Sequence, residues 1–130
     1  MKGETNLTKL IQNMNPILND GDYVFCTILD LSNIQIDLVI GTFREIEGWT
    51  IILSKMEADK LNLSYDYIAA WITLEIHSAL DAVGLTAAFA GALGKNGISA
   101  NVVAGYYHDH IFVAKKDKWK ALEVLENMKD

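Results

Sequence analysis

Three side chains that carry or accept protons stand together near the C-terminus: His108, Asp109 and His110. A carboxylate such as that of Asp109 accepts hydrogen bonds from an amino or guanidinium group. Two imidazoles at positions i and i+2 of a strand point the same way and are able to chelate a metal ion. Because no third metal ligand is evident, we expect a hydrogen-bonded pair of histidines and no metal site. The alternative for Asp109 is ordinary turn chemistry, since Asp is a common turn former.

A second group, residues 82–86, lies where a predicted strand gives way to a predicted helix. The free N–H groups and the positive dipole end of a helix start suit a carboxylate. Gly84 would let a ligand approach closely, or it only packs the helix against the sheet. The helix start would bind the carboxylate of an amino-acid zwitterion, and Asp109 would bind its amino group.

The residue types of a catalytic triad are present in His77, Ser78 and Asp81, but we expect no catalysis from them. Adjacent His and Ser seldom meet in nucleophile–base geometry, so Ser78 is expected to cap the helix or bind a ligand carboxylate. Cys26 lies in an apolar run without nearby basic residues and is expected in the core. Asn101 faces either a ligand or solvent. We therefore expect neither an enzyme nor a cofactor.

Secondary-structure elements must position these residues. The patterns in the second half of the chain predict the order β-α-β-β-α. The predicted elements are the strand 70–76, the helix 83–95, the strand 98–106, the strand 110–114 and the amphipathic helix 116–128. Residues 107–109 form the predicted turn between the last two strands. This order is typical of an α+β, ferredoxin-like fold, with an antiparallel sheet and helices on one face. The sheet needs one further edge strand, which the first half could supply.

The first half predicts the order α-β-β-β-α. Its predicted elements are the helix from a Thr5 or Asn6 cap to Asn13, the strands 23–29, 36–46 and 49–53, and the helix 56–61 with Ser54 as its cap. Arg44 and Glu45 are expected on a solvated strand face, an anion clamp at Arg44 being the alternative. The three tryptophans are expected as core or interface anchors: Trp49, Trp71 and Trp119.

The composition describes an acidic globular chain. It has 130 residues, 51% of them hydrophobic, with 11 Lys and Arg against 17 Asp and Glu and a net charge of -6. Sparse basic residues disfavour nucleic acid and anionic lipid as partners. One cysteine forms no internal disulfide, and neither a signal peptide nor a membrane span is evident, so a reducing cytoplasm is expected.

Three stretches carry a family resemblance: GTFREIEGWT at 41–50, WITLEIHSALDAVGLTA at 71–87 and ISANVVAGYYHDHIFV at 98–113. Together, over about residues 7–125, they resemble the small bacterial tandem ACT-domain proteins. The second half also resembles the ligand-proximal ACT module of the animal cytosolic arginine sensor, which has a similar Asp-His before apolar residues. The corresponding division is a first module at 1–64 and a second at 65–130.

The resemblance implies regulatory binding of an amino acid or similar metabolite at an interface between ACT modules. Its ligand residues, transferred to matching positions, are Ser78, Val83, Gly84, Leu85, Thr86, Asn101, His108 and Asp109. A symmetric site in the first half is not expected, because no helix is predicted between its first two strands. A homodimer is expected, since exposed edges and helix faces of small modules tend to be covered. The alternative function is a protein-interaction module without a small ligand.

Overall fold

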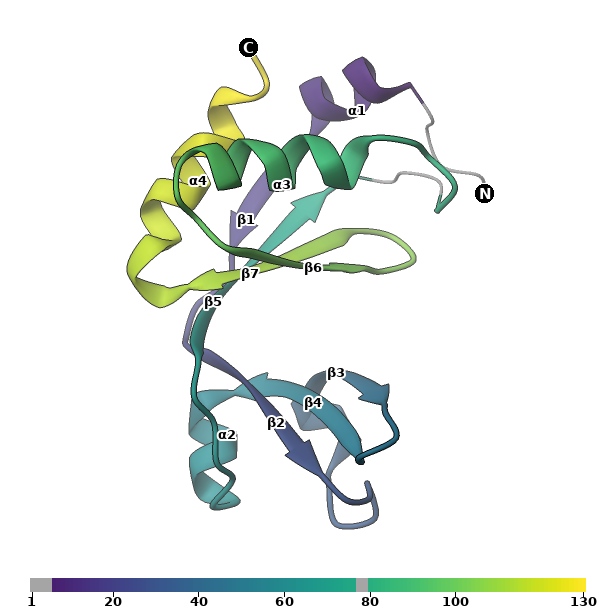
Figure 1. The fold of residues 1–130 in the computed structure, drawn as a ribbon, viewed down its shortest axis with the longest axis vertical. Helices are drawn as coiled ribbons and strands as arrows, with labels where there is room; N and C mark the ends of the chain where they lie inside the picture. Colours follow the sequence, from purple (N-terminus) through teal and green to yellow (C-terminus); the bar gives the residue numbers. More distant parts are fainter. Residues whose placement is uncertain (1–5, 77–79) are drawn as a thin grey trace. The chain divides into compact units, whose positions relative to one another are not determined.

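The computed structural model describes residues 6–76 and 80–130, which form two compact units. Unit 1 combines the described residues up to Asp20 with Ala70–Asp130, and unit 2 is the intervening segment Gly21–Ala69 (Figure 1). In sequence, unit 2 is thus inserted into unit 1. The division at residues 64 and 65 follows chain order and stays a prediction about sequence modules, whereas contacts in space join the N-terminal segment to the second half.

Unit 1 contains an antiparallel sheet in the order β1-β5-β7-β6. Its strands are β1 (Asn15–Leu18), β5 (Ile68–Glu75), β6 (Ala100–Ala104) and β7 (Asp109–Ala114). The N-terminal strand β1 supplies the predicted extra strand, with Asn15 opposite Glu75 and Leu18 opposite Ile72. The first two residues of β5 pair instead within unit 2.

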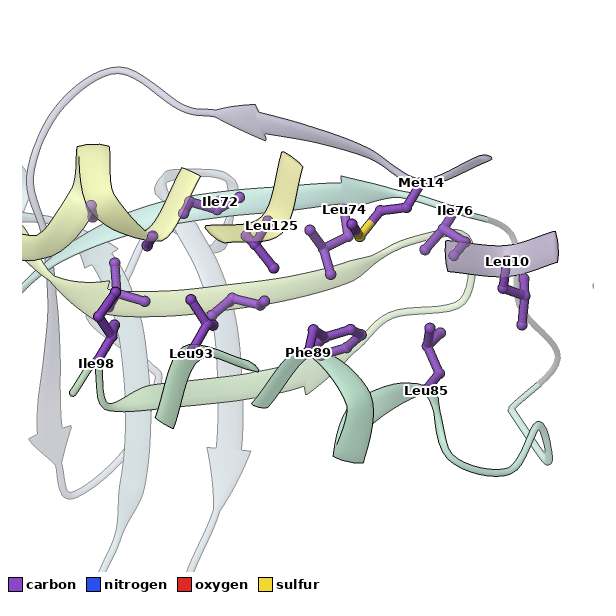
Figure 2. Close-up of a cluster of buried hydrophobic side chains, with 14 residues drawn as sticks. Leu10, Met14, Ile72, Leu74, Ile76, Leu85, Phe89, Leu93, Ile98 and Leu125 are labelled. Atoms are coloured by element: carbon purple, nitrogen blue, oxygen red, sulfur yellow. The ribbon is translucent and has the colours of Figure 1, made fainter. Parts of the chain in front are cut away.

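One face of this sheet carries the helices α1 (Leu7–Asn13), α3 (Leu85–Lys95) and α4 (Lys118–Asn127), the last preceded by the 3-10 turn η2 (Lys115–Asp117) (Figure 1). The predicted alternation along β5 is confirmed, because Ile72 and Leu74 are fully buried while Trp71 and Thr73 are partly exposed. Figure 2 shows the core between sheet and helices, which includes Phe89 of α3.

Unit 2 repeats the same sheet order on a smaller scale, as β3-β4-β2-β5. Its elements are β2 (Tyr23–Ile28), the 3-10 turn η1 (Ile36–Leu38), β3 (Val39–Arg44), β4 (Trp49–Ser54) and α2 (Lys55–Lys60). Ser54 caps α2 as predicted, since its hydroxyl oxygen accepts the Glu57 N–H at 3.2 Å. The main cluster of buried side chains in this unit consists of five residues: Val24, Cys26, Ile51, Leu53 and Ala58. The predicted α+β, ferredoxin-like class is therefore confirmed in both units.

Two predicted boundaries were wrong in a way that matters for the chemistry. Asp109 is the first residue of β7, paired with Ala104, and not part of the turn. Helix α3 begins at Leu85 rather than Val83, so Gly84 is its N-cap. Gly84 and Asp109 therefore lie at the ends of regular elements, where backbone hydrogen bonds fix their positions.

Other predicted elements were also corrected. The strand predicted from Ile36 begins only at Val39, because residues 36–38 close a 3-10 turn with the Leu38 N–H bonded to the Gln35 carbonyl at 3.0 Å. Strand β6 is shorter than predicted. Trp119 is 67% exposed, which excludes the core role on α4, while its expected role as an interface anchor stays a prediction.

Candidate functional site

The start of α3 presents backbone N–H groups without a side-chain cap. Gly84, the N-cap residue, has a left-handed φ of 92°, and no side chain bonds the helix start there. A Cβ at this position would lie 3.3 Å from Cδ2 of Leu7, so the glycine also permits close packing of α1. The positive end of the dipole of this eleven-residue helix lies at Gly84. The local geometry suits an anion.

The residues around Gly84 divide into those that face solvent and those that anchor the helix. Val83 is 85% exposed and Thr86 is exposed, so both side chains are accessible to a ligand. Leu85 is buried in the core and offers only its backbone N–H. Ser78 lies outside the described residues.

Asp109 is a buried carboxylate. It is 6% exposed, and the adjacent His108 attracts its negative charge. It is in phase along β7 with Ile111 and Val113, which belong to the core, so its side chain lies on the helix-bearing face. Burial raises the pKa of this carboxyl, and attraction to His108 only partly opposes the rise.

The helix start and Asp109 belong to the same end of unit 1. Strand β6 runs from the C-terminal end of α3 back toward its N-terminus, so the β6–β7 turn lies at the N-terminal end of α3 (Figure 1). One end of the unit therefore combines backbone donors suited to an anion with a carboxylate suited to a cation.

His108 and His110 do not form the expected hydrogen-bonded pair. The His108 carbonyl accepts the Gly105 N–H at 2.9 Å and closes the turn, while its buried Nδ1 has no partner among the residues described. His110 instead accepts a hydrogen bond at Nδ1 from the Trp71 indole N–H at 3.1 Å. An Nδ1 acceptor requires a neutral ring with its proton on Nε2. The two imidazoles therefore have separate roles.

A polar network on the helix-free face surrounds His110, and our sequence reasoning missed it. The Asn19 amide donates to the Thr73 hydroxyl at 2.9 Å and to the Trp71 carbonyl at 3.2 Å. The Trp71 ring also stacks on Phe112, at 6.2 Å between centroids. A Cβ on Gly105 would lie 3.2 Å from Nε2 of His110, so the imidazole packs directly against the β6–β7 turn. The polar alternation along β5 was the available signal.

The pKa of His110 reports whether this network is buried. We expect the imidazole to titrate below the ordinary value of 6.5, because desolvation lowers its pKa. At pH values between the lowered pKa of folded His110 and the ordinary value of 6.5, the unfolded chain binds more protons than the folded chain. The stability contributed by neutral His110 is therefore lost as pH falls below 6.5. An NMR titration of the imidazole Hε1 resonances measures this pKa. A midpoint at or above 6.5 for His110 would contradict the buried, neutral ring.

Asn101 lies apart from the other candidates. It is opposite Phe112 in the β6–β7 pair, exposed, and its amide reaches the Phe112 carbonyl at 3.5 Å. Since Phe112 is out of phase with Asp109 along β7, Asn101 is on the opposite face of the sheet. The structure thus brings Gly84 and Asp109 to one end of unit 1 but does not place Asn101 with them.

Residues 6–76 and 80–130 contain neither a metal-binding cluster nor a membrane-spanning helix. Within them, three or more His, Cys, Asp or Glu side chains are nowhere grouped to hold a metal ion. In the same residues, every helix is too short or too polar to cross a membrane. Cys26 is buried as predicted, and burial raises the pKa of its thiol.

Comparison with solved structures finds a similar fold across nearly the whole chain. A Vibrio cholerae protein of unknown function, described as a possible transport protein, is 48% identical, with a TM-score of 0.85 and 95% and 96% of the two chains covered. An Agrobacterium tumefaciens protein is 18% identical, with a TM-score of 0.67 and 89% of each chain covered. The regulatory subunit of aspartate kinase from Thermus thermophilus is 9% identical, with a TM-score of 0.63 and coverage of 89% and 98%. The last two show the fold alone.

Family models assign both halves. An ACT domain model matches residues 2–70, and a second ACT domain model matches residues 67–127. A search of curated proteins finds no match. ACT domains are regulatory ligand-binding modules, and in this chain the uncapped start of α3 lies at the same end of unit 1 as Asp109. The chain belongs to the ACT-domain family and carries two ACT domains in tandem.

Proposed function

We propose that this protein is a regulatory, non-catalytic binder of an amino acid or a similar small metabolite. The site is the end of unit 1 that holds the start of α3 and Asp109. The ligand carboxylate lies against the backbone N–H groups after Gly84, and a cationic nitrogen of the ligand bonds to Asp109. His108, whose Nδ1 is buried without a partner among the described residues, contributes a further polar contact.

The observation that carries this proposal is the burial of Asp109, which is 6% exposed, at the end of unit 1 where α3 begins. Burying a charged group costs free energy unless the group is paired or hydrogen-bonded. A bound ammonium or guanidinium group removes that cost, so part of the ligand's affinity comes from relieving it. The resemblance to the arginine sensor agrees with a cationic ligand and stays a prediction.

The test is thermal unfolding of the full chain against each of the twenty standard amino acids. A ligand present at about 100 times its dissociation constant stabilises by about 2.7 kcal/mol, which raises Tm by several degrees for a chain of this size. We expect a shift with one or a few amino acids in the wild type. Asp109→Asn, which keeps the shape and removes the charge, should abolish it.

Glu123→Gln is the matched control, because Glu123 is an exposed carboxylate of the same unit. This variant should respond to the ligand as the wild type does. A shift that survives Asp109→Asn would move the site elsewhere. Failure of every amino acid at millimolar concentration would favour the protein-interaction module instead, and the next experiment would then be partner capture.

A further inference from the structure

The turn between β6 and β7 carries two exposed tyrosines. Tyr106 and Tyr107 are 64% and 65% exposed, and their rings meet edge to face at 5.0 Å between centroids. They lie between Gly105 and His108, whose backbone groups bond at 2.9 Å and close the turn. This turn lies at the end of unit 1 where α3 begins, and Asp109 follows it directly (Figure 1). The tyrosine rings are therefore at the same end of the unit as the proposed ligand site.

Two exposed aliphatic side chains precede α3 at this end. Leu80 is 73% exposed and Val83 is 85% exposed, and Gly84 follows Val83 directly. A group of exposed hydrophobic side chains in one place is typical of a binding surface, whereas single ones need no explanation. Of the seven large hydrophobic side chains exposed in the described part of unit 1, four lie in residues 80–84 and 105–109, and the others are Ile17, Val103 and Trp119.

The charges in these two segments indicate what kind of ligand side chain fits. Residues 80–84 and 105–109 contain two carboxylates, Asp81 and Asp109, and no Lys or Arg. If Asp109 binds the ligand's amino group, Asp81 is the carboxylate left in these segments for a cationic side chain, and it is exposed. An exposed ion pair contributes little to affinity, whereas covering exposed apolar surface is favourable. Leu80 and Val83 offer no polar side-chain atom at all, so the surroundings favour an apolar ligand side chain.

We propose that the ligand is an amino acid with a large apolar side chain, aromatic or branched aliphatic, and that Val83, Tyr106 and Tyr107 select it. This inference rests on the proposed function, in which the ligand carboxylate lies after Gly84 and its amino group at Asp109. The side chain of the ligand then lies against the two tyrosine rings and Val83. The same three residues give a small or charged side chain little to bind, because they supply apolar surface and no charge.

Isothermal titration calorimetry of the full chain with phenylalanine, leucine, serine and arginine tests the selection. We expect phenylalanine or leucine to bind at least about tenfold more tightly than serine and arginine. The double change Tyr106→Ser with Tyr107→Ser, and separately Val83→Ser, should each weaken that binding at least about tenfold. Trp119→Ser is the matched control, since Trp119 is an aromatic residue of unit 1 that is 67% exposed on α4. Circular dichroism verifies that each variant is folded.

The outcomes separate this inference from the proposed function. If arginine or serine binds most tightly and Asp109→Asn abolishes that binding, the proposed function stands and the selection for an apolar side chain is overturned. The selection is also overturned if the tyrosine and Val83 variants bind phenylalanine and leucine as the wild type does, or if Trp119→Ser weakens binding equally. If none of the twenty standard amino acids binds, the proposed function fails and this inference fails with it.

Discussion

Phe89→Ala should lower the free energy of unfolding by about 3–5 kcal/mol, the usual cost of truncating a buried phenylalanine. Phe89 is fully buried in the core of unit 1, where it lies between the sheet and the helices (Figure 2). The change removes apolar contacts and leaves a cavity, because the β-sheet and α4 on either side cannot collapse into the space. A small domain has only about 5–15 kcal/mol of stability, so this is a large fraction.

Urea unfolding followed by circular dichroism measures this loss. Trp119→Ala is the control, since it removes a still larger aromatic side chain that is 67% exposed on α4. We expect that variant to change stability by less than about 1 kcal/mol. If Phe89→Ala cost no more than Trp119→Ala, the core shown in Figure 2 would not be the one that holds unit 1 together.

Asp109→Asn should have the opposite effect on the unliganded protein and raise its stability at neutral pH. The folded state raises the pKa of Asp109 by burial, so it binds more protons than the unfolded chain at pH values just above the ordinary Asp value of 3.8. Stability from this group therefore falls as pH rises through that window and stays reduced above it. The neutral amide has no charge to bury, so it escapes the part of this cost that comes from desolvating a charged group.

The measurement is urea unfolding of both proteins at several pH values between about 4 and 7. The advantage of Asp109→Asn should be largest at neutral pH and should shrink as pH approaches 3.8. Asp81→Asn serves as the control, because Asp81 is exposed. A neutral-pH loss of stability in Asp109→Asn would mean that the carboxylate already has a favourable partner, and it would remove the main support for the ligand site.

Local patterns were enough to predict most elements of the fold. The alternation along β5, the Ser54 cap of α2 and the Asn6 cap of α1 each depend on neighbours within a few residues. Strand β1 was missed, since its four residues include Pro16 and follow a helix directly. Its strand conformation comes from pairing with β5, about sixty residues later, which no local pattern reports.

In the candidate site too, local patterns predicted some features, while others depend on residues distant in sequence. Gly84 and Asp109 were found from their residue types at predicted element ends, where backbone groups and charges are exposed to ligands. The burial of Asp109 was not foreseen, because a turn residue was expected and only the phase with Ile111 puts its side chain on the core face. The Trp71–His110 bond spans 39 residues and needed the tertiary structure.

Unit 2 lies between the two sequence segments of unit 1, so unit 1 cannot finish folding until unit 2 has been synthesised. Residues 6–20 leave the ribosome before β5 and α4, so β1 cannot pair with β5 or be covered by the core that includes α4 until those elements have emerged. Unit 2, a continuous segment, is complete well before then. The nascent chain therefore carries β1 unpaired while unit 2 folds, and the later emergence of β5 and α4 completes the core that covers it.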